Sequence, residues 1–174
     1  MLTTIPKPIL SYFAGYPEPI LLQLTALYEA NKIGQYLKNK YPKRHEVVSE
    51  KALFERVNQY KQRYLKNAPN LSSVKYKKQQ QLVANALGTH TFKTKQHGNK
   101  LKKSHEIAIA EQLKCAPEAL LDVLIVHELA HFKEKDHNKA FYKLCCYMEP
   151  DYHQLELDLR LFCVAVAMGE NPYA

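Results

Sequence analysis

Hydrophobic residues recur at helical spacing in five segments of the chain, and prolines or capping residues mark where most of these segments end. The first predicted helix covers residues 20–39 and ends before Pro42, which cannot continue a helix. The second is predicted to begin with Ser49 as its N-cap and to run to Leu65. Three further helices are predicted to begin at Pro117, Asn138 and Pro150 and to end near residues 135–136, 148 and 169.

The stretch between residues 72 and 112 has a different pattern, with β-branched residues and an alternation of larger and smaller or polar side chains. The alternation is clearest where Ile107 and Ile109 alternate with Ala108 and Ala110. The segments SVKYKK, LVANALGTHTFKTK and HEIAIAEQL are therefore predicted to form three antiparallel strands. The basic sequence KQHGNKLKKS is predicted to be the turn between the second and third strands.

These elements predict an α+β protein in which a small antiparallel three-stranded sheet packs on the helix that begins at Pro117. We expect residues 1–69 to form an N-terminal helical extension packed on the core. Residues 70–174 are then expected to form the domain that holds the functional site. At 174 residues, the two parts are expected to make one compact unit.

Composition narrows the class of protein further. Hydrophobic residues make up 46% of the chain, which excludes a disordered protein. The N-terminal sequence lacks a secretory signal, and no apolar run is long enough to cross a bilayer, so we expect a cytoplasmic protein without a membrane partner. The cysteines form no CxxC pair and are expected to be reduced thiols. They are Cys115, Cys145, Cys146 and Cys163.

Charge is distributed unevenly along the chain. Residues 1–110 contain 19 Lys and Arg against 6 Asp and Glu, whereas residues 111–174 contain 6 against 11. The basic clusters lie between residues 38 and 103 and are compatible with an anionic partner, including nucleic acid. The alternative interpretation is a solvated basic face that has no partner.

The sequence VHELAHFKEKDH predicts a metal site. His127 and His131 are four positions apart, so in a helix both imidazoles lie on one face and can bind one Zn²⁺ at about 2.0–2.1 Å. Glu128 lies about 100° further round the helix, where it can accept a proton from a metal-activated water. A catalytic zinc needs a third protein ligand, and His137 is the nearest candidate. The alternatives to His137 are Asp151, His153 and Glu156.

The segment IVHELAHFKEKDHNKAF resembles the YgjP-like metallopeptidase family, in a wider group that includes SprT-type and WLM proteins. The elements before it are in a similar order, so the resemblance covers about residues 70–165. It implies a zincin-like minimal metallopeptidase fold, the three histidines as ligands of one zinc ion, and Glu128 as general base. The chain departs from the family's pattern before the third strand, where Trp and Cys are missing. The histidine spacing also equals that of metzincins, but Glu134 occupies the position of their glycine.

Three functions are compatible with the motif and the resemblance. The first is a zinc-dependent hydrolase of metallopeptidase type, in which a metal-activated water attacks a peptide bond with Glu128 as general base. The second is a metal-dependent nucleotide phosphohydrolase (a pyrophosphatase), whose anionic substrate would suit the basic clusters. The third is a SprT-like protease module that docks on nucleic acid through basic residues 38–103. The partner is accordingly a peptide, a protein or an anionic small molecule, and the pattern does not predict an oligomeric state.

Two further expectations concern the surroundings of the site. A developing oxyanion requires a hydrogen-bond donor, and residues 105–110 are expected to form an edge strand to which an extended peptide could add. His45, His90 and His97 are expected to be surface or turn residues. The candidate donors, chosen by residue type alone, are His105, Tyr142, Tyr147, Tyr152 and His153.

Overall fold

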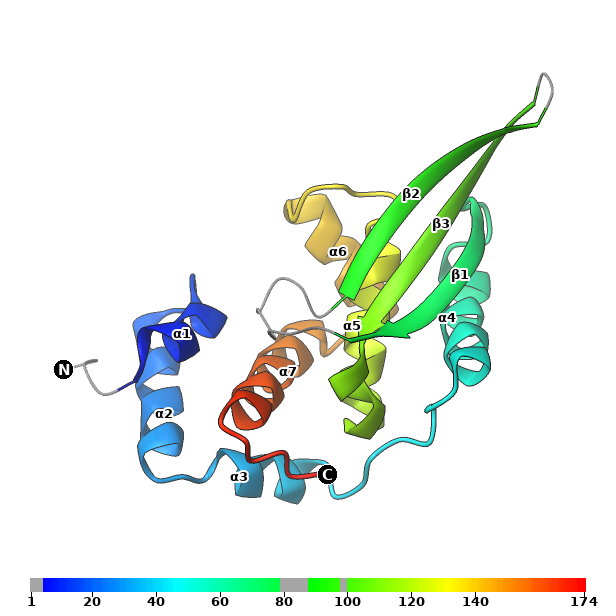
Figure 1. Cartoon of the computed structure of the whole chain (residues 1–174). Helices are drawn as coiled ribbons and strands as arrows, with labels where there is room; N and C mark the ends of the chain where they lie inside the picture. Colours follow the sequence, from blue (N-terminus) through cyan, green and yellow to red (C-terminus); the bar gives the residue numbers. More distant parts are fainter. Residues whose placement is uncertain (1–4, 79–87, 98–99) are drawn as a thin grey trace.

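The computed structural model describes the backbone of residues 5–78, 88–97 and 100–174, and the side chains of residues 5–78 and 104–174 (Figure 1). Within these residues the chain forms helices and one small sheet, which confirms the α+β class. The elements are α1 (Lys7–Leu10), the 3-10 helix η1 (Ser11–Phe13), α2 (Glu18–Glu29), α3 (Ile33–Lys40), α4 (Glu50–Tyr64), β1 (Asn70–Lys77), β2 (Gly88–His97), β3 (Lys100–Ala110), the 3-10 helix η2 (Glu111–Cys115), α5 (Glu118–Ala130), α6 (Lys139–Met148) and α7 (Tyr152–Ala167).

The sheet is mixed, with the strand order β1-β3-β2. Val74 of β1 and His90 of β2 both lie opposite Ile107 of β3, but β1 runs parallel to β3 and β2 runs antiparallel to it. The prediction of three antiparallel strands is therefore wrong for β1. Alternation of side chains identifies a strand but does not give its direction. Parallel strands need a long connection between them, and the chain between β1 and β3, which includes β2, provides it. Residues 105–110, predicted at an edge, lie in the central strand, and the edge strands are β1 and β2.

The hairpin formed by β2 and β3 is longer than the sequence pattern indicated. A turn was predicted over residues 95–104, but β2 continues to His97 and β3 begins at Lys100. Because β1 pairs with β3 only from Ser104 onward, the first part of β3 pairs with β2 alone. The two strands therefore project from the body of the molecule as an arm (Figure 1). Residues 82–87, which were predicted to belong to the second strand, lie outside the described residues.

The single helix predicted over residues 20–39 is divided into α2 and α3 at Asn31. Asn31 has a φ of 53°, a left-handed conformation that asparagine tolerates better than most residues. The amides of Asn31 and Lys32 donate to the carbonyl oxygens of Tyr28 (3.0 Å) and Leu27 (2.9 Å), the pattern of a Schellman motif. Hydrophobic residues continue on both sides of this break, so the periodicity alone did not reveal it.

Two helices begin at the caps that the sequence predicted. The Ser49 hydroxyl accepts a hydrogen bond from the amide of Ala52 (3.1 Å) at the start of α4. The Asn138 side-chain oxygen accepts one from the amide of Phe141 (2.9 Å) at the start of α6. Each bond satisfies an amide that the first turn of a helix leaves without a partner in the helix itself, and this fixes where the helix begins.

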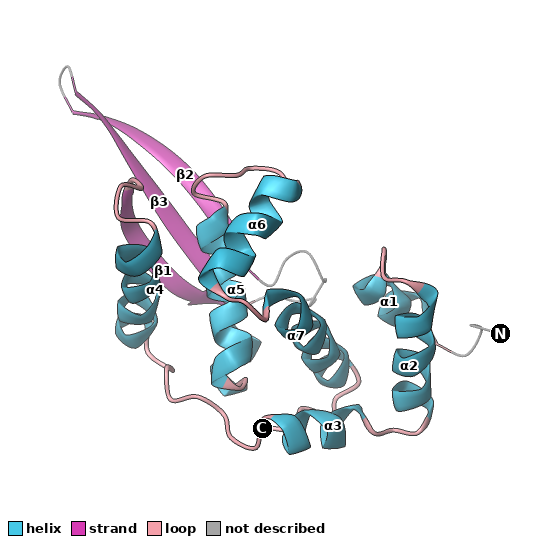
Figure 2. Cartoon of the chain, turned by 180° about the vertical axis from the view of Figure 1, so that it is seen from behind, coloured by secondary structure: helices cyan, strands magenta, loops and turns pink. Residues whose placement is uncertain are grey.

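Helices α4 and α5 pack against the sheet, and α6 and α7 pack against α5 (Figure 2). Val74 of β1 and Ile107 and Ile109 of β3 are buried, and β1 packs against α4, whose buried residues include Leu53 and Val57. Consequently α5 lies in the middle of the core, as expected for the helix that carries the histidine motif. Burial of so much apolar surface is the main force that holds this helix in place.

The N-terminal helices are joined to the rest of the molecule through α7. Asp158 of α7 is completely buried, and its carboxylate accepts hydrogen bonds from Lys40 Nζ (2.6 Å), Tyr41 Oη (2.6 Å) and Tyr36 Oη (3.0 Å). These donors satisfy a charge that would otherwise be costly to bury. The division into parts at residue 69 stays a prediction.

His45 is an exception to what was expected of the histidines outside the motif. It is only 4% exposed, its Nδ1 accepts a hydrogen bond from the amide of Val47 (2.9 Å), and its Nε2 donates to the carbonyl oxygen of Leu113 (2.6 Å). The prediction of a surface residue is therefore wrong, because the buried imidazole connects the segment before α4 to η2 by a hydrogen bond. His90 and His97 belong to β2, and their side chains lie outside the described ones.

Two expectations about the whole chain can be compared with the structure. In the part of the chain that is described, no helix is both long and apolar enough to cross a membrane. All four cysteines lie in that part and are free thiols, as predicted.

Candidate metal centre

The first two histidines of the motif lie where α5 ends. Ten residues of α5 are buried, including Glu128, so the end of the helix has little freedom to move. The helix ends at Ala130, earlier than the predicted end near residues 135–136, and His131 is its C-cap. The backbone of His131 is still helical (φ −64°, ψ −11°), so its imidazole lies one turn beyond that of His127, with ring centroids 5.1 Å apart.

The chain turns back immediately after α5 and brings His137 to the other two histidines. The amides of Lys133 and Glu134 donate to the carbonyl oxygen of Ala130 (3.1 and 3.0 Å), which closes the turn. The Nε2 atoms of His137 and His127 are then 3.1 Å apart. One ring nitrogen from each of the three histidines lies within 4.8 Å of the others. The structure thus brings together the three side chains that were predicted to bind a metal, hereafter the histidine cluster (His127, His131 and His137).

Two members of the cluster are held by hydrogen bonds to their outer nitrogen. Nδ1 of His131 donates to the carbonyl oxygen of Glu134 (2.9 Å), so its Nε2 carries a lone pair. Nδ1 of His127 is hydrogen-bonded to Tyr152 Oη (2.8 Å). Partners of this kind orient metal-binding imidazoles and fix their tautomers in many metal sites. Tyr152 was named only as one possible oxyanion donor, and its buried hydroxyl instead contacts His127.

Phe141 ends the segment that carries the family resemblance, but the sequence indicated no role for it. Its ring centroid lies 4.9 Å from that of His127, 4.7 Å from that of His131 and 4.8 Å from that of His137, and the side chain is completely buried. It therefore forms an apolar floor under all three imidazoles. The signal that could have identified it is the Asn138 cap, which places Phe141 on the inner side of the first turn of α6.

The charge states of the cluster suit metal binding. Burial, followed by the nearby His131 and His137, lowers the pKa of His127 to about 3, and burial also lowers the pKa of His137. Both imidazoles are therefore neutral near pH 7, and the neutral imidazole is the form that binds a metal. Burial raises the pKa of Glu128 to about 8. At pH 7 the buried carboxyl is therefore mainly protonated in the metal-free protein, and a cation bound in the cluster would favour the carboxylate form that can accept a proton.

The donor set and its spacing fit one zinc ion. Two imidazole nitrogens bound to a tetrahedral zinc at about 2.0–2.1 Å are separated by roughly 3.3 Å. The 3.1 Å between Nε2 of His127 and Nε2 of His137 is close to that value. Three imidazoles leave one position of a tetrahedral ion for water or substrate, which is the arrangement of catalytic rather than structural zinc sites.

The other residues considered for the site lie outside the cluster. Among the described residues, the group that could hold a metal contains none of the proposed alternatives to His137. Glu156 is hydrogen-bonded to Tyr16 and Arg160, and the ring of His153 lies 5.6 Å from that of Tyr142. The ring of His105 stacks on Phe132 at 3.9 Å, and that of Tyr147 contacts Tyr64 at 5.6 Å.

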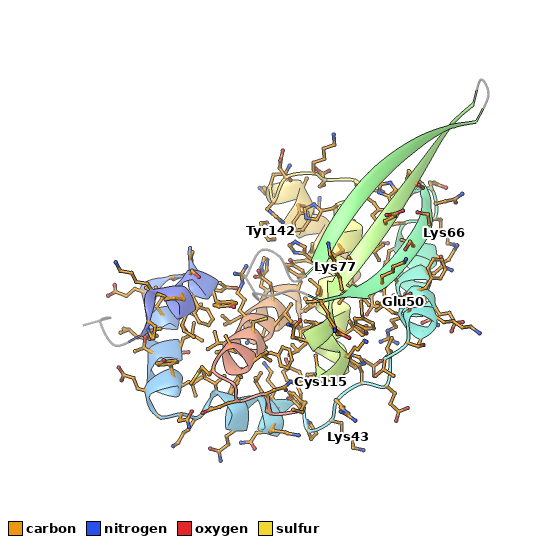
Figure 3. All side chains as sticks on the ribbon, in the orientation of Figure 1. Lys43, Glu50, Lys66, Lys77, Cys115 and Tyr142 are labelled. Atoms are coloured by element: carbon orange, nitrogen blue, oxygen red, sulfur yellow. The ribbon has the colours of Figure 1, made fainter. Side chains whose placement is uncertain are left out.

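Among the predicted oxyanion donors, Tyr142 lies outside the histidine cluster but next to Phe141 and Tyr152, which both contact the cluster. It belongs to α6 and is labelled in Figure 3. Its ring lies 5.3 Å from that of Phe141 and 6.3 Å from that of Tyr152, so the side chain stands between α6 and the start of α7. The side chain is partly exposed, which leaves its hydroxyl a possible donor to a substrate.

Comparisons with known proteins give the family. The profile of the YgjP-like metallopeptidase domain matches residues 12–161. The chain is 44% identical over 162 residues to the UTP pyrophosphatase of Escherichia coli (strain K12), in an alignment that covers 93% of this chain and 97% of that protein. No significant match to a solved structure is found. The family match includes α2, α3 and α4, so it begins well before residue 70, where the resemblance was predicted to start. The chain therefore belongs to the YgjP-like metallopeptidase-domain family and is a hydrolytic enzyme.

Proposed function

We propose that the enzyme hydrolyses a phosphoanhydride bond of a nucleoside triphosphate such as UTP, at one zinc ion held by His127, His131 and His137. The observation that supports this most is the histidine cluster in a chain that is 44% identical to a UTP pyrophosphatase along nearly its whole length. The sequence motif had favoured a peptide bond as the target. The order of the two hypotheses changes because the relative's name specifies a nucleotide, and 19 Lys and Arg in residues 1–110 suit an anionic substrate.

Zinc bound in the cluster would supply Lewis-acid chemistry, lowering the pKa of a water and polarising a phosphoryl oxygen. Glu128 would accept a proton from the attacking water, whose oxygen forms the new bond to phosphorus. As the bridging P–O bond breaks, Glu128 would return the proton to the leaving phosphate group. Tyr152 and the carbonyl of Glu134 would keep the imidazoles oriented, and Phe141 would keep water away from their buried side.

A turnover assay with the zinc-loaded full chain tests this proposal. Release of phosphate or pyrophosphate from UTP is measured beside cleavage of an unstructured peptide. The Glu128→Gln variant should lose about a hundredfold or more of its UTP turnover, the usual contribution of general acid–base catalysis, and should retain its zinc. The matched control is Glu111→Gln, which changes a carboxylate in the surface pair with Lys114 and should behave as wild type. Full turnover by Glu128→Gln with zinc bound would refute the role of Glu128.

Peptide hydrolysis is the second candidate function. It is favoured by the metallopeptidase description of the family and by the sheet that packs against the motif helix, as a zincin-like fold requires. The same buried Glu128 and the same histidine cluster would serve a peptide carbonyl in place of a phosphoryl group. Cleavage of the peptide without turnover of UTP, in the assay above, would make this the preferred function.

Docking on nucleic acid through basic residues 38–103 stays a prediction. Part of that region forms the arm of β2 and β3, which projects from the body (Figure 1). Binding to single- or double-stranded DNA should fall steeply with salt if lysines of this region contact phosphates. Absence of binding at low salt would remove this hypothesis and would leave the metal centre unaffected.

A further inference from the structure

Helix α7 carries a row of polar side chains that begins at the histidine cluster. Tyr152, Glu156 and Arg160 are spaced four positions apart, so they lie on one face of the helix, about 6 Å from one to the next along its axis. The first of them, Tyr152, contacts His127. The other two, hereafter the α7 pair (Glu156 and Arg160), therefore extend away from the metal centre along α7.

The α7 pair is held in one orientation by several hydrogen bonds. Arg160 Nε and Nη2 both donate to Glu156 Oε1, at 3.0 and 2.5 Å, and Arg160 Nη1 donates to the carbonyl oxygen of Tyr12 (2.7 Å). The hydroxyl of Tyr16 donates to the other oxygen of Glu156 (2.9 Å). The side chains of Arg160 and Glu156 are 16% and 18% exposed, so the pair lies partly out of water but still reaches solvent.

The contacts of the α7 pair come from the other end of the chain. Tyr12 belongs to η1 and Tyr16 follows it, and this N-terminal segment lies beside α7 (Figures 1 and 2). The segment makes a hydrogen bond to each member of the α7 pair: the carbonyl oxygen of Tyr12 accepts from Arg160, and the phenol of Tyr16 donates to Glu156. Such an arrangement fixes a guanidinium before any ligand arrives, which lowers the entropic cost of binding.

Arg160 also lies at a defined distance along α7 from the metal centre. It is two helical turns beyond Tyr152, which contacts His127, so about 12 Å of helix axis separates the two side chains. A substrate that is bound at the histidine cluster and extends along α7 by this length would reach the guanidinium.

We propose that Arg160 is a specificity-determining residue that binds a phosphate group of the substrate beyond the scissile bond, and that Tyr16 is its positioning residue. Nε, Nη1 and Nη2 of Arg160 each donate one hydrogen bond within the fold, and the guanidinium lies 5.6 Å from the centroid of the Tyr16 ring, yet the side chain still reaches solvent. A planar guanidinium with fixed N–H groups matches phosphate oxygens better than an ammonium does. This inference rests on the proposed function, because it takes a nucleotide as the substrate.

The test measures binding, so that it does not depend on turnover. Calorimetry with the zinc-loaded Glu128→Gln protein gives the Kd values of UTP, UMP and uridine, and the measurement is repeated after Arg160→Lys. We expect Kd for UTP to rise by about tenfold to a hundredfold, the range for loss of a charge-assisted hydrogen bond. The rise should be smaller for UMP and absent for uridine. Arg56→Lys is the matched control, since Arg56 is paired with Glu118 and Asp122 on α5, and it should leave all three values unchanged.

A second variant separates positioning from folding. Tyr16→Phe removes only the phenol that donates to Glu156, and it should weaken UTP binding in the same direction but by about threefold to tenfold, as for one hydrogen bond. Its effect should again depend on the number of phosphates, which a general loss of folding would not produce. In the wild-type background, both variants should raise KM for UTP more than they lower kcat.

Two results would overturn the inference. The first is an unchanged Kd for UTP in Arg160→Lys, and the second is an equal loss for UTP and uridine, which would make Arg160 a structural residue only. If wild type hydrolysed UTP and Arg160→Lys bound it normally, the inference would fail and the proposed function would stand. If UTP bound in an Arg160-dependent way but was never hydrolysed, the proposed function would fail and the inference would stand.

Discussion

The histidine cluster and the α7 pair are neighbours, but they are held in place in different ways. All three histidines lie between residues 127 and 137, and the packing of α5 and Phe141 fixes them. The α7 pair depends on Tyr16 and Tyr12, which are 140 and 148 positions away in the sequence. We infer that the metal-binding end of the site tolerates changes in the N-terminal helices, whereas the proposed substrate-binding end does not. Mutations can test this difference directly.

The largest effect is expected where the cluster meets the core. Phe141→Ala should lower the free energy of unfolding by about 4 kcal/mol, as for other buried phenylalanines, because it leaves a cavity under the three imidazoles. Zinc affinity should fall in the same variant, since the rings lose the surface that orients them. Urea denaturation and zinc titration would measure the two quantities. A destabilised protein with unchanged zinc affinity would show that Phe141 supports the fold alone.

A smaller effect, confined to the fold, is expected at the junction of the N-terminal helices with α7. Asp158→Asn removes a buried charge that accepts hydrogen bonds from Lys40, Tyr36 and Tyr41, and it should cost about 2 kcal/mol. Zinc affinity should remain within about twofold of wild type, because none of these residues touches the cluster. Tyr36→Phe, which removes one of the bonds, should cost about 1 kcal/mol. A large loss of zinc affinity in Asp158→Asn would contradict the separation of the two regions.

The smallest effect concerns the pH dependence of stability at His45. Burial lowers the pKa of His45, and this outweighs the raising effects of the Leu113 carbonyl, Asp122 and Glu118; Arg56 also lowers it. The unfolded chain therefore binds a proton at His45 more readily than the folded chain does. The contribution of His45 to the free energy of unfolding should be fully present above about pH 6.5 and should be lost as the pH falls toward the lowered pKa of the folded state.

Chemical denaturation at a series of pH values would measure this loss. Because His105, His127 and His137 shift in the same direction, the informative quantity is the difference from His45→Gln. That variant keeps a donor and an acceptor but cannot titrate, so its stability should decrease less between pH 7 and pH 5. Identical curves would mean that His45 is not held neutral in the fold.

The metal cluster could be predicted from the sequence because its geometry is local. A spacing of four on a helix fixes the relation of His127 to His131, and a short turn is enough to bring in His137. The burial of α5 could also be predicted, since four apolar residues, Val123 to Val126, directly precede His127. Phe141 needed more information, because its place depends on how α6 returns to α5.

The parts that could not be predicted depend on distant segments. Side-chain alternation cannot give the direction of β1, which is fixed by a partner strand reached through β2. Asp158 and Arg160 belong to a stretch, LELDLRLF, that looks like an ordinary amphipathic helix. Besides neighbours one turn away on α7, each has a partner more than a hundred positions earlier in the chain, Tyr41 for Asp158 and Tyr12 for Arg160, and only the fold brings these segments together.

The most direct test of the account is whether the histidine cluster binds one metal ion. Zinc titration of the metal-free full chain at pH 7, with elemental analysis, should give one ion per chain. His137→Ala should weaken binding by about a hundredfold or more without unfolding the protein, because this ligand is exposed. His153→Ala, which changes an exposed histidine outside the cluster, should bind zinc as wild type does. Unchanged zinc binding by His137→Ala, or loss of binding by His153→Ala, would contradict the assignment of the site.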